Sequence, residues 1–433
     1  MRLLRRWWVR WIVLPLVALV GAHQVWTLTL KWEFERRITK LRAAGEPVDL
    51  GDLRRPRIPD EDNAAALWEE AHEWYEEHLH TPAVLVQNTP EDIWDEGDRE
   101  AVAEYLGGGD PYVDLLARAA AKPDMWQDLE WEKGAGMEVT AIPQMQDAMG
   151  YLEHRARCAE RGPDAVRFVA IMLDLAPKLE RSCLILVLVR WMVDRTAADA
   201  IKVLFRKPGF DAREARACLD PRLARIDDGS DLRKAFEGER VMALSVSRRW
   251  IAGESPLRIM KELSGDDGAR DDAESAADRL AASCIVRPFA YRDALRLLDV
   301  TERAIVIAGL PSREAIPAAE ALRDEDRAGV LNLASQLWAG LPVKAVRERP
   351  KHDAYVRIAR VGLALLAIKQ ETGEWPETLD AVVPLVGEAC LEDPYTGERL
   401  QYEPGVRVQA AVPIPEWSKD MPEEYEIVWR FGG

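Results

Sequence analysis

Histidine and glutamate side chains crowd one short segment of the chain, and together these residue types can bind a transition metal or move protons. The members of this cluster are Glu69, His72, Glu73, Glu76, Glu77, His78 and His80. On a helix, Glu69 would share a face with His72, and Glu77 with His80, because residues three apart are neighbours. It is the densest collection of ligand-type side chains in the sequence.

The known metal motifs do not fit this cluster. A zinc-protease helix needs a second histidine four residues after His72, and position 76 is glutamate. A di-iron bundle needs Glu-x-x-His on two helices, whereas the residue three before His154 is Tyr151. We therefore expect a solvated charged helix face and predict no metal site there.

Other catalytic motifs are incomplete or unspecific. The run from Gly253 to Leu257 lacks the second glycine of a nucleophile elbow, and no Gly-x-x-x-x-Gly-Lys phosphate loop occurs. The sequence leaves open a hydrolase that uses two carboxylates, because among 75 acidic residues a suitable pair is easy to find. The sequence names no catalytic residue.

Charge and cysteine content exclude some classes of protein. The first thirty residues carry four arginines and no acid, so the remainder holds 54 basic and 75 acidic residues, a net charge of −21. So acidic a domain repels phosphate backbones, and we expect no nucleic-acid partner. The five cysteines have no Cys-x-x-Cys spacing, and we interpret them as structural thiols.

One stretch near the amino terminus decides where the chain resides. Trp11 to Leu30 holds twenty residues without a charged side chain, which is the length that a helix needs to cross a bilayer. Tryptophans bracket this stretch, as in interfacial belts. A cleaved signal ending near Ala22 is the alternative, but the apolar run continues eight residues further. We expect an uncleaved anchor that contacts the lipid bilayer through residues 11–30.

Basic residues on the two sides of this stretch bear on its orientation. Four arginines and the amino terminus precede it, and five basic residues follow within a short distance, so the count alone is balanced. A short arginine-rich tail is hard to export, whereas long domains translocate largely regardless of charge. We expect residues 1–30 to form a cytoplasmic tail and a single-pass inner-membrane anchor, with the large domain in the periplasm.

The rest of the chain divides into three further parts. Residues 31–59 predict a juxtamembrane helix, which ends at Gly45, followed by a linker that contains prolines. Together these two elements would form a stalk. Residues 60–349 carry successive helical patterns, so the fold class is mainly α, and a stack of helical repeats stays open. Within them, Cys183–Val193 is too short for a second membrane span and predicts a buried core helix.

The last part, residues 350–433, predicts a small α/β unit. A helix over 353–372 precedes a series of turn and packing residues: Gly373, Trp375, Pro376, Asp393, Pro394, Gly397 and Tyr402. Gly373 is expected at positive φ, Pro376 at the start of a returning helix, and the Asp393–Gly397 segment in a turn before short strands. We expect Trp375 and Tyr402 to be largely buried and the unit to be structural.

This series of residues resembles the region after the long helix in the major pseudopilins of type II secretion. It is also similar to the end of a wider group of bacterial membrane-anchored helical proteins, in which an early helix starts near a motif like Asn63-Ala64-Ala65. In pseudopilins the final loop binds calcium, so the resemblance implies Asp393, Glu398 and Glu403 as calcium candidates. The chain lacks the pseudopilin Gly-Phe processing site and the early glutamate, so the resemblance does not extend to polymerisation.

These observations predict a non-catalytic, membrane-anchored envelope protein that acts as a scaffold or binds an envelope protein partner. The alternative is a periplasmic hydrolase that uses paired carboxylates. A pocket with convergent acids and a carboxylate of raised pKa would favour the hydrolase, and a long groove without them would favour binding. Apart from the calcium candidates, we expect no cofactor.

Overall fold

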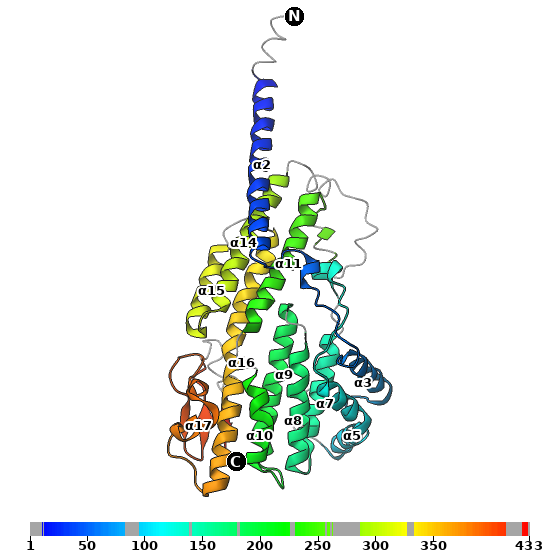
Figure 1. Ribbon diagram of the computed structural model, residues 1–433, viewed down its shortest axis with the longest axis vertical. Helices are drawn as coiled ribbons and strands as arrows, with labels where there is room; N and C mark the ends of the chain where they lie inside the picture. The colour runs from blue at the N-terminus through cyan, green and yellow to red at the C-terminus, as the bar shows by residue number, and fades with distance from the viewer. Residues whose placement is uncertain are drawn as a thin grey trace, which may run out of the picture.

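The computed structural model describes residues 11, 13–82, 95–137, 141–179, 182–225, 230–255, 258–259, 262, 286–326, 333–412 and 427–431. Within these ranges the chain is mainly helical, with one small sheet, which confirms the predicted mainly α class. Figure 1 shows long helices aligned with the long axis of the molecule, with α2 rising beyond the others at one end. None of the helices in these ranges combines the length and the apolarity that a membrane crossing needs.

Helix α2 (Leu14–Ala43) joins the apolar segment directly to the helical body. Its last turns bury side chains that recur every three or four residues: Phe34, Ile38 and Leu41. They pack against α14 (Arg287–Ala308), where the ring of Tyr291 meets that of Phe34 at 5.9 Å. The stalk expected from the sequence therefore does not form, because residues 31–43 belong to the body and the linker begins only after them.

The next helices form one side of the body. They are α3 (Ala65–His78), α5 (Glu96–Gly107), α6 (Asp110–Ala121), α7 (Ala141–Cys158) and α8 (Gly162–Leu175). Local chemistry sets their starts: the Asp95 carboxylate accepts the N–H of Asp98 to cap α5, and a proline occupies the first turn of α8. The buried Trp68 donates its indole N–H to Gln144 at 2.8 Å and ties α3 to α7.

The short η5 helix (Ala176–Lys178) leads to α9 (Leu184–Leu204) at the centre of the body. Helix α9 packs against α7, α8, α11 and α16. The apolar block Cys183–Val193 supplies its core contacts, and within it Ile185 is the large side chain that is exposed, at 46%. The predicted core helix is confirmed, because neighbours on several sides cover the block.

The remaining helices are α10 (Ala212–Ala224), α11 (Ser230–Ala252), α15 (Ser312–Asp326) and the 40-residue α16 (Leu333–Thr372). Helix α16 contacts α9, α10, α14 and α15, and it runs through Pro342 and Pro350 without ending. Each proline removes one backbone donor, but packing on four neighbours holds the helix together. The domain boundary expected at residue 350 thus lies inside one helix.

The carboxy-terminal unit folds back onto α16. It comprises η7 (Leu379–Val382), α17 (Val383–Val386), η8 (Glu388–Leu391), β1 (Gln401–Glu403), β2 (Arg407–Gln409) and β3 (Val428–Arg430). The strands form an antiparallel sheet in the order β1-β2-β3, with Val408 opposite both Tyr402 and Trp429. Trp429 is fully buried on Gly362 of α16, where an added Cβ would lie only 2.0 Å from the indole ring. The predicted small α/β unit is confirmed.

Candidate functional site

The first turns of α2 expose apolar side chains on all sides. The exposed large apolar residues of this segment are Val13, Leu14, Leu16, Val17, Leu19, Val20, Val25, Trp26 and Leu28. Leu19 is 67% exposed and Val25 is 65% exposed. Successive residues lie about 100° apart around a helix, so these positions cover its whole circumference. A helix that is apolar all round is stable where protein or lipid surrounds it.

This exposed segment meets the body where α14 begins. The ring of Trp26 contacts the ring of Phe289 edge-on, with centroids 5.2 Å apart. Three turns further along α2, Arg37 pairs with Asp299 at 2.5 Å and with Glu302 at 2.9 Å. Burial alone would lower the pKa of Arg37, but the two carboxylates outweigh it and raise that pKa. An aromatic contact and a charged clamp therefore fix α2 against α14.

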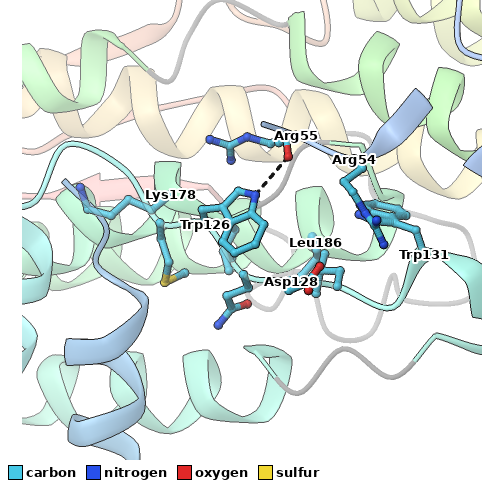
Figure 2. Close-up of a pocket in the computed structure, with 11 residues that line it drawn as sticks. Arg54, Arg55, Trp126, Asp128, Trp131, Lys178 and Leu186 are labelled. Carbon is cyan, nitrogen blue, oxygen red and sulfur yellow. Dashed lines mark hydrogen bonds between the residues drawn. The ribbon is translucent and has the colours of Figure 1, made fainter. Parts of the chain in front are cut away.

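A pocket lined by cations and tryptophans lies where the linker crosses the body (Figure 2). Arg54 and Arg55 follow η2 (Leu50–Leu53), and Trp126 comes from the loop that precedes η4 (Trp131–Gly136). The Trp126 indole N–H donates to the carbonyl of Arg55 at 3.1 Å. Lys178 closes the opposite wall from η5.

The cations of this pocket are already engaged. The pairs are Arg54 with Glu132, Arg55 with Asp124, and Lys178 with the carbonyl of Lys122. Burial lowers the pKa of Lys178, and neighbouring carboxylates oppose that shift. The cavity is about 20 Å³, which is the room of one water molecule. The pocket therefore serves as a junction that fixes the linker to the body, and it has no room for a substrate.

A larger groove of about 710 Å³ lies between α5, α6, α7 and α8. Its floor is apolar and is formed by the buried side chains of Leu106, Val113 and Phe168. The guanidinium of Arg155 lies over the Phe168 ring, 5.1 Å from its centroid, and pairs with Asp110 at 2.7 Å. Burial alone would lower the pKa of Arg155, but the hydrogen bonds and charges of Asp110 and Tyr151 outweigh it and raise that pKa.

Acidic side chains form the rim of this groove. Asp114 pairs with Arg167 at 3.1 Å, whereas Glu160 and Asp164 form no ion pair with a described residue. The rim therefore has an excess of negative charge above an apolar floor. This combination suits an amphipathic segment with basic side chains, since its apolar face can cover the floor while its cations meet the rim.

A charged network is buried between α9 and α16. His352 lies between two carboxylates, with Nε2 at 3.1 Å from Asp194 and Nδ1 at 3.1 Å from Asp353. Arg349 reaches Asp353 at 3.7 Å, and the Trp191 ring stacks on the imidazole at 5.3 Å. Burial alone would lower the pKa of His352, but the hydrogen bonds and charges of the two aspartates outweigh it and raise that pKa. The network is enclosed, so we assign it to stability.

Among the residues that the structure describes, two carboxylates have raised pKa values and bear on the hydrolase alternative. Burial raises the pKa of Glu239, which accepts hydrogen bonds from the backbone of Leu184 and the indole of Trp338, both at 3.1 Å. Burial also raises the pKa of Asp147, with a further contribution from Glu76, although the charge of His72 opposes it. Neither acid lines the groove, the Trp126 pocket or the shallow pocket between α14 and α15.

The histidine and glutamate cluster is divided among separate contacts. His72 meets Glu76 at 3.3 Å, His78 stacks on Trp74 with centroids 4.6 Å apart, and His80 follows the end of α3. Among the described residues, no three side chains of the metal-binding types gather as a ligand group. The structure thus keeps the three histidines on or beside α3 without bringing them to one point.

The carboxy-terminal motif has the backbone geometry expected of its turns. Gly373 has φ of 82° and Gly397 has φ of 74°. Asp393 is buried, and its carboxylate accepts the N–H groups of Tyr395 at 2.8 Å and Ala411 at 2.5 Å. The Asp393–Gly397 segment, with Pro394 inside it, therefore forms the expected turn, closed by the Gly397 N–H on the Asp393 carbonyl at 2.8 Å.

The packing residues of this unit differ partly from expectation. Trp375 and Tyr402 are half-buried; the Trp375 ring meets Phe431 at 4.6 Å, and the Tyr402 hydroxyl donates to the carbonyl of Pro376 at 2.9 Å. Pro376 begins no helix: the first helical turn starts three residues later, at Leu379, after Thr378 in an extended conformation.

The calcium candidates occupy three different environments. The Asp393 carboxylate binds backbone amides, Glu403 lies 3.5 Å from Arg407, and the carbonyl of Glu398 accepts the N–H of Asp393. Glu398 and Glu403 are exposed, whereas Asp393 is buried. Only the aspartate is held in a fixed geometry by the fold.

Comparison with protein-family models, curated proteins and solved structures finds no match for this chain. A function must therefore be argued from the geometry above.

Sequence reasoning missed the groove and the buried histidine, because their parts come from distant segments. One signal was available for the second: Arg190 and Asp194 stand among the apolar residues of α9, where a buried charge needs a partner.

Proposed function

We propose that this chain is a membrane-anchored protein that holds a helical, partner-binding body beside a bilayer. The observation that carries the proposal is the apolar surface around the first turns of α2, which protrude from the body in Figure 1. The apolar run from Trp11 to Leu30 has twenty residues, and at 1.5 Å per residue it matches the hydrocarbon thickness of about 30 Å. Insertion would remove this surface from water.

The proposed orientation places the amino terminus in the cytoplasm and the body outside it. Support comes from the arginine-rich tail before Trp11 and from the size of the domain that follows. A cysteine introduced as Glu374→Cys provides a test, because position 374 is exposed and lies outside the groove between α5 and α8. A membrane-impermeant maleimide should label this cysteine in cells whose outer barrier is opened but whose inner membrane is intact, and the wild-type chain gives the background labelling. Labelling that requires disruption of the inner membrane would reverse the orientation.

The partner in this proposal binds in the groove between α5 and α8. An apolar floor with an acidic rim is complementary to a basic amphipathic segment of an envelope protein. The body then acts as a scaffold rather than a catalyst, and the membrane anchor limits where the two proteins meet.

The anchor is tested with paired substitutions. The double variant Leu16→Arg/Leu19→Arg changes two exposed residues of α2, and each arginine should cost about 3–4 kcal/mol of insertion free energy. The wild-type chain should stay in the membrane pellet after alkaline washing, and the double variant should be released. The control is Val306→Arg, because Val306 is 68% exposed on α14 and lies outside the proposed span.

Two results would refute the anchor. One is a double variant that pellets like the wild type. The other is recovery of a soluble wild-type product that starts near His23, which would identify the segment as a cleaved signal.

The groove is tested in the full chain in its membrane. A photo-crosslinking residue at Ala103 should capture one defined protein, and the double variant Glu160→Lys/Asp164→Lys should abolish that product by reversing the charge of the rim. Glu374→Lys reverses an exposed charge outside the groove and should leave the product unchanged. Capture that survives the reversal of the rim would refute the groove as the binding site.

A further inference from the structure

The contact between α2 and α14 fixes how deep the body sits relative to the proposed membrane span. Trp26 and Trp32 flank the end of the apolar run as an interfacial belt does, so Trp26 marks the boundary between acyl chains and headgroups. The Trp26 ring touches Phe289, so the beginning of α14 lies at nearly the same depth. The body therefore cannot stand clear of the bilayer.

The rigidity of this junction keeps that depth constant. Phe34 and Tyr291 pack together below the Trp26 contact, and Arg37 binds Asp299 further along. These contacts extend along several turns of both helices, so α14 cannot swing away from α2 without losing a buried cluster and a charged clamp.

The side chains at this depth have the chemistry of a lipid headgroup layer. Phe289 is half-buried, and the guanidinium of Arg292 lies over its ring, 5.4 Å from the centroid. Arg287 and Arg292 are exposed, and so is Lys31, the first basic residue after the apolar run of α2. Aromatic rings favour the boundary between acyl chains and headgroups, and guanidinium groups bind phosphates with two parallel hydrogen bonds.

We propose that Arg287, Phe289 and Arg292 form a second membrane contact, in which Phe289 enters the interface and the two arginines bind phosphates of anionic phospholipids. This inference rests on the proposed membrane anchor. It assigns to the start of α14 the task of seating the body on the bilayer, so that α2 and α14 together set its height and tilt.

The depth is tested with the full chain in phosphatidylcholine vesicles that also contain phosphatidylglycerol. A photo-crosslinking residue is placed at position 19 in α2, at 289, or at 306 near the far end of α14. Positions 19 and 289 should form adducts with lipid, and position 306, exposed on the same helix, should not. Lipid adducts at 19 without any at 289 would overturn the inference and leave the anchor standing. Failure at position 19 as well would overturn both.

The contact between the two arginines and lipid phosphates is tested by changing the lipid composition of the vesicles. Adducts at 289 should increase when phosphatidylglycerol is added to phosphatidylcholine vesicles, because each arginine near an anionic surface favours the contact roughly fivefold. The variant Arg287→Gln/Arg292→Gln should lose this dependence. Arg303→Gln is the matched control, since Arg303 lies on α14 but pairs with Glu325 at 2.7 Å. The same dependence in the double variant would overturn the role of the arginines.

Discussion

Replacement of the buried His352 tests how α16 is joined to α9. In His352→Gln the fully buried Asp194 loses its cationic partner, and no described group bonds its second carboxylate oxygen. Removal of one member of a buried ion pair leaves an uncompensated charge, which costs about 3–5 kcal/mol. We expect the variant to lose that much of its free energy of unfolding.

The unfolding free energy lost in His352→Gln should depend on pH, and the raised pKa of His352 decides whether the loss grows or shrinks as the pH rises. The folded state holds the proton more tightly than the unfolded state, whose imidazole has the ordinary value of 6.5. The charged pair therefore contributes fully below pH 6.5, and its contribution disappears as the pH rises through the higher folded pKa. The difference in unfolding free energy between wild type and variant should shrink over that rise.

The assay is urea unfolding of the full chain in mild detergent, followed by tryptophan fluorescence at several pH values. His80→Gln is the control, because His80 is exposed beyond the end of α3. The double variant His352→Gln/Asp194→Asn removes both charges, so it should be more stable than the sum of the single losses by about 1–3 kcal/mol. Equal urea midpoints for His352→Gln and His80→Gln at every pH would refute the reasoning.

Three other substitutions test the core and the turns by the same urea assay or by thermal unfolding. Leu186→Ala should cost about 2–5 kcal/mol of unfolding free energy because Leu186 is buried in α9. The control Ile185→Ala changes an exposed neighbour and should cost about 1 kcal/mol or less. Equal losses in the two variants would contradict the packing. Gly373→Val should cost about 1–3 kcal/mol from backbone strain alone, since φ is 82° and nothing lies within 4 Å of an added Cβ; an unchanged melting temperature would refute the strain. Asp393→Ala should cost about 1–3 kcal/mol because it leaves backbone N–H groups unpaired, and the control Glu398→Ala should cost little. Calcium should not shift the melting temperature of the wild type. A calcium-induced shift that Asp393→Ala abolishes would indicate a metal site.

Local signals in the sequence predicted most helices of the body. The apolar spacing of α8 and α9, and the Gly162-Pro163 start of α8, are local features that a few neighbouring residues reveal. Helix α16 shows where that reading fails. Pro342 and Pro350 each signal a break, yet the helix passes through both, because contacts with α9, α10, α14 and α15 outweigh a local cost of about 3 kcal/mol per proline.

The difference between local and long-range contacts also separates the turn that the sequence predicted from the sites that it missed. The Asp393 turn was predicted because its partners lie within a few residues, with the exception of Ala411. The pair of Asp194 and His352 joins positions 158 residues apart, and the groove combines four helices. Only the folded chain brings such groups together, so single-sequence patterns cannot locate them.

The place of α16 in the chain has a consequence for biosynthesis. Helix α9 ends at Leu204, and the helix that covers it is complete only at Thr372. At the usual rate of translation, roughly 10–30 s pass between these two points, during which the surfaces that α16 will cover stay open. If α2 has already entered the bilayer, the unfinished body waits beside lipid with part of its core uncovered. A chaperone that shields this intermediate would then act late in synthesis, and truncation before residue 372 should produce aggregation rather than a shorter stable body.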